Sequence, residues 1–186
     1  MQRTRERRVV NVVQLGNVGY SGEPQLEKTR NVAEIFSGSE FIDLRVTGID
    51  LNEYRGQQLR GTWTQLTTDF RTGLKGFSDN FIDLITSEFA FGDYDQEGVE
   101  LWWSPVKTVE NTEETSQIAY RKLRPGGKML VSTLSSTAHF LEEAFQKAGF
   151  NPDKIKTRKL RPDECEKTPW LRKNKHLNPY LITAEK

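Results

Sequence analysis

Residues 121–132 of the chain read Arg-Lys-Leu-Arg-Pro-Gly-Gly-Lys-Met-Leu-Val-Ser. Proline cannot continue a helix, and glycine accepts the left-handed backbone of a tight reversal. The stretch therefore predicts that a helix ends near Leu123 and that a buried strand begins at Gly127. Such a corner is typical of a sheet whose strands alternate with helices.

The rest of the chain continues this alternation. Apolar and β-branched runs predict strands at residues 9–15, 44–50, 62–67, 81–86, 127–133, 155–160 and 179–184. Helical spacing of apolar residues predicts helices at 23–36, 52–59, 108–123 and from Ser136 or Thr137 to Gly149. Residues 71–80 read as short pieces between glycines that end in a turn. The pattern predicts an α/β fold, with a doubly wound, mostly parallel sheet and a final antiparallel strand pair.

The composition fits one domain that spans residues 1–186. Its hydrophobic content of 35% supports a sizeable core. No apolar run reaches the roughly 18 residues of a membrane helix, and the basic N-terminus lacks the apolar part of a secretory signal. The single cysteine, Cys165, excludes an intramolecular disulfide and a cysteine-rich zinc site. We therefore expect a cytoplasmic protein without a metal site or a membrane partner.

The charge is unevenly distributed, although the net charge is only +1. Residues 1–8 hold four Arg and one Glu, and they read as a flexible basic arm. Residues 154–176 hold nine Lys or Arg and three acidic residues. This second stretch suits RNA, a phosphorylated substrate or a protein partner. The alternative is an ordinary solvated surface.

Three predicted strands end in residues that suit a ligand. Ligands of doubly wound sheets bind outside the carboxyl ends of the strands. Gly16 and Gly19 follow the first strand and allow a close approach of the backbone, although they also suit a simple loop. Asp50 ends the second strand and can accept hydrogen bonds from ribose hydroxyls, or cap a helix. Asp69-Phe70 follows the third strand and offers an acceptor for an adenine amino group and a ring to cover its face, or a turn.

In this order the segments resemble the successive motifs of class I S-adenosylmethionine (SAM) dependent methyltransferases. The motifs are the glycine loop after the first strand, Val46-Thr47-Gly48-Ile49-Asp50, Asp69-Phe70, Phe81-Ile82-Asp83-Leu84-Ile85 and Leu123-Arg124-Pro125-Gly126-Gly127-Lys128. The resemblance covers roughly residues 8–150. It implies a seven-stranded sheet in the order 3-2-1-4-5-7-6, SAM as the cofactor, and methyl transfer to an unidentified acceptor.

The resemblance also assigns the site. It implies that SAM contacts Gln14, Gly16, Asn17, Gly19, Asp50, Leu51, Asp69, Phe70 and Ser87. The glycines lie under the methionine part, Asp50 binds the ribose and Asp69 binds adenine. Residues 87–91 line the methyl-transfer site. There Glu88 is the first candidate for a general base and Asp93 the second, whereas a solvated loop carboxylate is the other interpretation of Glu88.

The glycine loop departs from the family pattern. Gln14 occupies the position of a usual acidic residue, and Gly16 and Gly19 are three residues apart instead of forming Gly-x-Gly-x-Gly. An amide can hydrogen-bond but cannot neutralise the SAM ammonium group. A second hypothesis is therefore a catalytically weak or inactive methyltransferase-like domain that acts as a binding or scaffold module. A nicotinamide-binding domain is disfavoured because Gly-x-Gly-x-x-Gly is absent.

Overall fold

The computed structural model describes residues 8–16, 26–38, 42–51, 63–90, 105–166, 171–172 and 177–186. Seven strands in these residues form one sheet in the order β3-β2-β1-β4-β5-β7-β6. Its strands are β1 (Arg8–Leu15), β2 (Ile42–Asp50), β3 (Trp63–Thr67), β4 (Ile82–Glu88), β5 (Leu123–Leu134), β6 (Ile155–Lys159) and β7 (Pro179–Glu185). The strands from β3 to β5 pair in parallel, and β7 runs antiparallel to both β5 and β6. The predicted fold class and strand order are confirmed.

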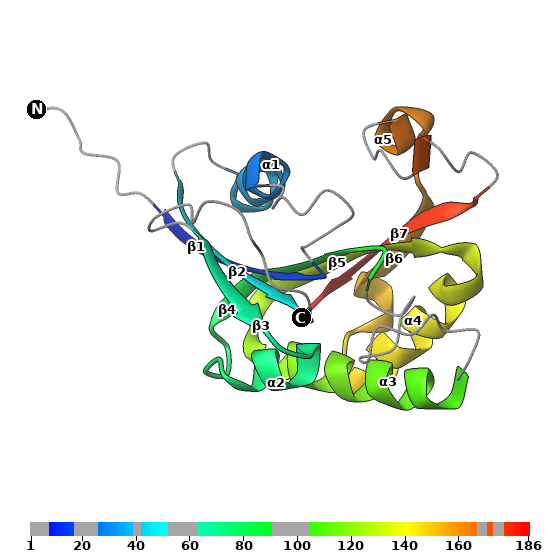
Figure 1. Ribbon diagram of the computed structural model, residues 1–186, viewed down its shortest axis with the longest axis horizontal. Coiled ribbons are helices and arrows are strands. Elements are labelled where there is room, and N and C mark those ends of the chain that lie inside the picture. Colours follow the sequence, from blue (N-terminus) through cyan, green and yellow to red (C-terminus); the bar gives the residue numbers. More distant parts are fainter. Residues whose placement is uncertain are drawn as a thin grey trace, which may run out of the picture.

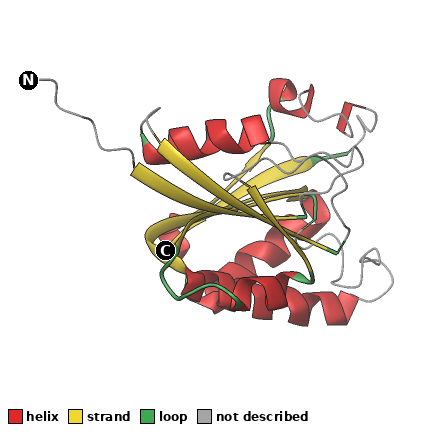
Figure 2. Cartoon of the chain, turned by 60° about the vertical axis from the view of Figure 1, so that its left-hand side comes forward, coloured by secondary structure: helices red, strands yellow, loops and turns green. Residues whose placement is uncertain are grey.

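Helices lie on both faces of this sheet (Figures 1 and 2). One face carries α1 (Leu26–Ser37), and the other carries α2 (Phe70–Lys75), α3 (Pro105–Lys122) and α4 (Ser135–Ala148). A 3-10 turn, η2 (Pro152–Lys154), precedes β6, and the short α5 (Pro162–Glu166) follows it. Among the described helices, none has the length and apolar character needed to cross a membrane.

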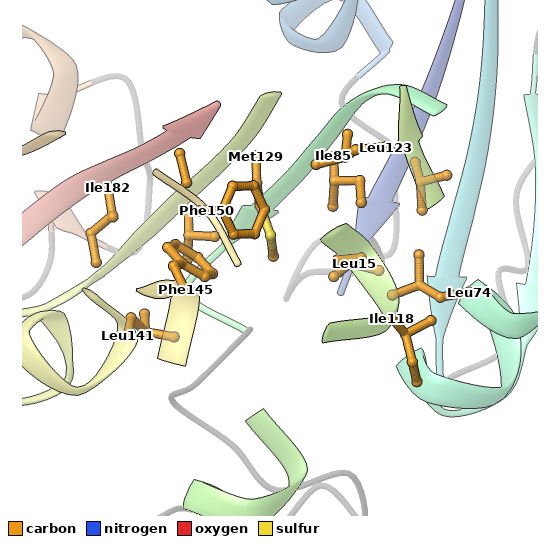
Figure 3. Close-up of a cluster of buried hydrophobic side chains, with 14 of the residues drawn as sticks. Leu15, Leu74, Ile85, Ile118, Leu123, Met129, Leu141, Phe145, Phe150 and Ile182 are labelled. Carbon is orange, nitrogen blue, oxygen red and sulfur yellow. The ribbon is translucent and has the colours of Figure 1, made fainter. Parts of the chain in front are cut away.

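The larger hydrophobic core lies between the sheet and α2, α3 and α4 (Figure 3). Strand side chains such as Leu15, Ile85 and Met129 meet helix side chains such as Ile118 and Phe145, and all five are at most 1% exposed. Burying each large apolar side chain contributes about 1.5–3 kcal/mol. This core therefore fixes the sheet against the three helices.

A smaller core lies under α1. Val10 and Val12 of β1 pack there with Ala33 and Phe36 of α1. Side chains alternate between the two faces of a strand, so even-numbered β1 residues face α1 and odd-numbered ones face the larger core. This alternation decides on which face each candidate site residue lies.

The helix α2 was not predicted, and the reading of residues 71–80 as irregular pieces was wrong for its first half. Asp69 caps this helix by accepting hydrogen bonds from the backbone N–H and the hydroxyl of Thr72. Gly73 lies inside the helix, where a Cβ would come within 2.7 Å of the Ile49 side chain. Glycine has a low helix propensity, so the local sequence did not predict α2. The close packing against Ile49 nevertheless requires a glycine in this helix.

The corner at residues 121–132 also differs from the prediction. The helix α3 ends at Lys122, and Leu123 already pairs with Ile82 of β4. The next parallel pair is Leu84 with Lys128, so the intervening residues form a bulge in β5. Gly126 has φ +75°, the left-handed conformation that its glycine predicted. The strand therefore begins earlier than expected and contains the Pro-Gly-Gly reversal.

The ends of α4 give one wrong and one confirmed prediction. Leu134 is its N-cap residue and makes no side-chain capping bond, so neither Ser136 nor Thr137 begins the helix. Gly149 ends it with φ +107°, as predicted. The helix predicted at residues 52–59 lies outside the described residues.

Among the described strands, β6 forms one edge of the sheet and pairs with β7 alone. Three of its five residues, Lys156, Arg158 and Lys159, are cationic and exposed. The side chain of Arg158 is held by Glu164 of α5 through two contacts of 2.7 Å. The edge is therefore charged along its length.

Candidate functional site

The carboxyl ends of β1, β2, β3 and β4 meet at one edge of the sheet. Leu15 pairs with both Ile49 and Ser87, and Asp50 pairs with Thr67. Parallel neighbours lie about 4.8 Å apart, so the residues that follow these strands are close together. The predicted site residues of four strands therefore share one edge.

Asp50 and Asp69 lie on this same edge. The backbone N–H of Thr68 donates to the backbone oxygen of Asp50 at 2.9 Å, and Asp69 is the next residue along the chain. The Asp50 residue is only 7% exposed. Two carboxylates, one at the end of β2 and one just after β3, thus lie near each other at this edge.

Gln14 and Asp50 both face the α1 side of the sheet. Gln14 pairs with Gly48, which is two residues before Asp50 on the same face of β2. Gln14 is 7% exposed, and both side chains take part in interactions within the protein. An amide and a carboxylate therefore line the α1 face of the edge.

Gly16 begins the loop after β1 with φ +68°, and its backbone N–H donates to Ile49 at 2.9 Å. A Cβ at this position would overlap the Cβ of Ala90 and lie 3.6 Å from the Phe70 ring. Only glycine combines this backbone conformation with such close neighbours. The structure thus brings Phe70 and the segment after β4 close to Gly16.

Asp69 has a structural partner of its own. Burial raises the pKa of its carboxyl group, but the hydrogen bonds from Thr72 and the charge of Arg71 outweigh this effect and hold the pKa below its usual value. Arg71 in turn donates to Asn111 at 2.8 Å and contacts Glu114 at 3.1 Å on α3. Asp69 is therefore a charged acceptor fixed by α2, and nothing in the sequence pattern indicated the Arg71 contacts.

The end of β4 carries Glu88, which is half-buried and pairs with Ser132 of β5. Phe89 follows with φ +53°, and its backbone N–H donates to Ser132 at 2.8 Å. A left-handed conformation costs a bulky residue about 1–3 kcal/mol and is concentrated at functional sites. This turn directs Ala90 onto Gly16, and no local sequence signal indicates it.

The remaining predicted residues differ in exposure, and three of them lie outside the described part of the chain. Ser87 is buried at 4% exposure, and Leu51 is 43% exposed. Asn17, Gly19 and Asp93 lie outside the described residues.

Three of the six described cations in the basic stretch form ion pairs within the protein. Lys154 contacts Glu185 at 2.7 Å, Arg158 contacts Glu164 at 2.7 Å, and Arg161 contacts Glu164 at 3.4 Å. This pairing reduces the positive charge that these side chains offer to an external anion.

Comparison with known proteins gives structural matches only. No protein-family model matches the chain, and no curated protein matches its sequence. A SAM-dependent methyltransferase from Mesorhizobium loti matches with a TM-score of 0.59 and 15% identity, over 97% of this chain and 93% of that one. The Haemonchus contortus phosphoethanolamine N-methyltransferase 2 in complex with SAM matches with a TM-score of 0.59 and 15% identity, over 98% of this chain.

The second match shows a difference in length, because the chain spans half (50%) of the Haemonchus protein. The [4+2]-cyclase SpnF matches equally well, with a TM-score of 0.59 and 15% identity over 97% of this chain and 75% of that one. The protein has the class I methyltransferase-like fold over nearly its whole length. Since one match is a cyclase, the fold alone does not define the reaction.

Proposed function

We propose that this protein binds SAM at the carboxyl edge of β1, β2 and β4 and transfers its methyl group to an acceptor. The proposal depends most on one observation, the register that pairs Leu15 with both Ile49 and Ser87, because Gly16 and Asp50 are the next residues of their segments. The chemistry of the edge also fits the cofactor. SAM presents an ammonium group, a ribose diol and an adenine amino group, all of which donate hydrogen bonds, and this edge offers carboxylates and an amide to accept them.

Each side chain has a separate part in this proposal. Asp50 accepts from the ribose hydroxyls, and Asp69 accepts from the adenine amino group with Phe70 beside it. Gln14 orients the methionine part by hydrogen bonding without neutralising its charge. The bound cofactor supplies an activated methyl group on a sulfonium, so the protein mainly positions the acceptor and excludes water.

Glu88 is the proposed general base where the acceptor must lose a proton. It lies at the end of β4 beside Ser132, on the edge that carries Asp50. The turn at Phe89 fixes the direction of the chain after it. A base is unnecessary for an acceptor that is already deprotonated.

The test is binding of S-adenosylhomocysteine, measured as a rise in melting temperature. A ligand that binds only the folded state must stabilise it, by about 2.7 kcal/mol at 100 times its dissociation constant. Asp50→Asn should weaken binding at least about tenfold, since it removes a charged acceptor. Asp43→Asn is the matched control, because Asp43 is on the same strand with a side chain 53% exposed at its other end.

The alternative is a binding or scaffold module with weak or no catalysis. Two observations favour it: the amide of Gln14 in place of a carboxylate, and the contact of Ala90 with Gly16. Absence of any melting shift at millimolar S-adenosylhomocysteine would reject the enzyme proposal in favour of this alternative. Binding without methyl transfer from labelled SAM to a cell extract's proteins, RNA or metabolites would favour a cofactor-binding module.

A further inference from the structure

A groove lies on the face of the sheet that carries α2, under the amino halves of β1, β2 and β3. The short helix α2 packs under the carboxyl half of β2 through Gly73 and Ile49 and ends at Gly76. The amino half of the strands is therefore left without this helix. The resulting groove has a volume of about 210 Å³.

Two aromatic rings form one end of the groove. Phe77 and Phe81 stack with their centroids 6.3 Å apart and their planes at 25°. Phe81 is 45% exposed, which places it among the few large apolar side chains open to solvent in the described residues. Phe77 thus packs against one side of the Phe81 ring, and the exposed side of Phe81 can contact a ligand.

A cation, polar groups and three valines form the rest of the groove. Arg45 of β2 pairs in register with Asn11 of β1, and Thr47 and Thr64 lie beside it on β2 and β3. The Arg45 side chain is 62% exposed, and its contact with Asp43 is a 3.8 Å surface pair. An exposed ion pair of this kind contributes little to stability. The Arg45 guanidinium can therefore leave Asp43 and bind the anionic group of a ligand.

The spacing of the two ends fits one small molecule. Phe81 immediately precedes β4, which is two strands from Arg45, so the two ends lie roughly 10 Å apart across the strands at about 4.8 Å per strand. An aromatic ring that carries a single acidic group can contact both ends. We propose that this groove binds a small aromatic anion, with its ring against Phe81 and its carboxylate or phosphate on Arg45.

This site is separate from the proposed cofactor site. Asn11 is five residues before Gly16 on β1, a distance of roughly 16 Å along an extended strand. The proposal therefore does not depend on SAM binding. It holds for an enzyme and for a binding module alike.

Benzoate and phenyl phosphate are the probes for a calorimetric titration of the intact protein. We expect saturable binding with a dissociation constant of about 1 mM, an ordinary value for ligands of this size. Cyclohexanecarboxylate lacks the aromatic ring and benzyl alcohol lacks the charge, so each should bind at least about fivefold more weakly than benzoate. Equal binding of cyclohexanecarboxylate and benzoate, or no saturable binding of either aromatic anion, would overturn the proposal.

Two variants test the two ends of the groove. Phe81→Ser and Arg45→Gln should each lower the affinity for benzoate at least about fivefold without loss of the fold, because both side chains are exposed. Ile35→Ser and Arg161→Gln are matched controls, since Ile35 is 82% exposed on α1 and the Arg161 side chain is 67% exposed near α5. An equal loss of affinity in the controls would contradict the assignment.

A second copy of the chain is the competing occupant of this groove. Sedimentation of the wild type and of Phe81→Ser distinguishes it. A change of oligomeric state in the variant with unchanged benzoate affinity would show that the groove is an interface between copies and that the proposal is wrong.

Discussion

Gly16 and Ala90 lie so close together that any side chain at position 16 would overlap the methyl group of Ala90. These residues follow β1 and β4, two neighbouring strands that end at the same edge. The glycine is therefore required by a contact within the protein as well as by its left-handed backbone. Gly16, which the resemblance assigns to a cofactor-binding loop, therefore also allows the loops after β1 and β4 to pack together.

Gly16→Ala should destabilise the protein by at least about 2 kcal/mol. The left-handed backbone alone costs an alanine roughly 1–2 kcal/mol, and the overlap with Ala90 adds roughly 1–3 kcal/mol. Urea unfolding measures the free energy. Gly38→Ala is the control, because Gly38 has φ +67° and no atom within 4 Å of the position that a Cβ would take. This variant should therefore lose only the stability that the left-handed backbone costs an alanine. Recovery of the extra loss in the Gly16→Ala, Ala90→Gly double variant would confirm the contact.

Asp83→Asn should destabilise the protein by about 1.5–3 kcal/mol, the usual contribution of hydrogen bonds to a charged group. Asp83 is 2% exposed, accepts from the backbone N–H of Asn11 at 2.8 Å and lies 2.6 Å from the guanidinium of Arg124. The contact with Arg124 is an ion pair rather than an aligned hydrogen bond. Asp163→Asn, at a side chain 59% exposed, should change the free energy of unfolding by less than about 1 kcal/mol. Equal effects of the two substitutions would contradict this account.

Glu164 should make the stability fall in acid. The hydrogen bond from Arg158 lowers its pKa from 4.5 to about 2, burial opposes this shift, and the hydrogen bonds from Arg161 add to it. The folded state therefore favours the charged carboxylate, whose stabilisation is complete above the ordinary pKa and is lost as the pH falls from about 5 towards 2. Solvent screening limits the effect to about 1 kcal/mol. In Glu164→Gln the urea midpoint should depend less on pH over this range, and an unchanged dependence would show that other groups dominate.

Phe150→Ala should cost about 3–5 kcal/mol, because the ring is 2% exposed and packs against Tyr120 and Phe145 at centroid distances of 5.0 and 5.4 Å. Phe81→Ala makes the same chemical change at a ring that is 45% exposed and should cost much less. Thermal unfolding of the two variants measures the contrast. Similar losses would mean that Phe81 is packed as tightly as Phe150, which would also argue against an open groove.

The sequence predicts the sheet well because each strand carries its own signal. β-branched runs mark β1 and β2, and the reversal at Pro125-Gly126-Gly127 marks the entry to β5. Hydrophobic patterning and turn residues are local signals, so they can be recognised in a single sequence. Even there the bulge that begins β5 at Leu123 depends on pairing with β4, which no local pattern reveals.

The sequence predicted which candidate site residues share one edge of the sheet, but it did not predict the contacts that these residues make. The ends of parallel strands meet at one edge by topology, so Gly16, Asp50 and Asp69 could be grouped before their geometry was known. The helix α2 was missed because Gly73 opposes helix formation locally and is needed only for packing against Ile49. The contact between Gly16 and Ala90 joins residues far apart in the chain, and it depends on the turn at Phe89 that sequence propensities disfavour.

The charged edge formed by β6 has a consequence for solubility. An open edge strand can pair with the same strand of another molecule, and lysine or arginine side chains oppose this by mutual repulsion. Lys156 and Lys159 give β6 that protection, whereas a neutral strand in their place would offer a template for intermolecular sheet growth. Self-association through this strand is thus limited by electrostatic repulsion, which makes the colloidal behaviour of the protein dependent on salt concentration.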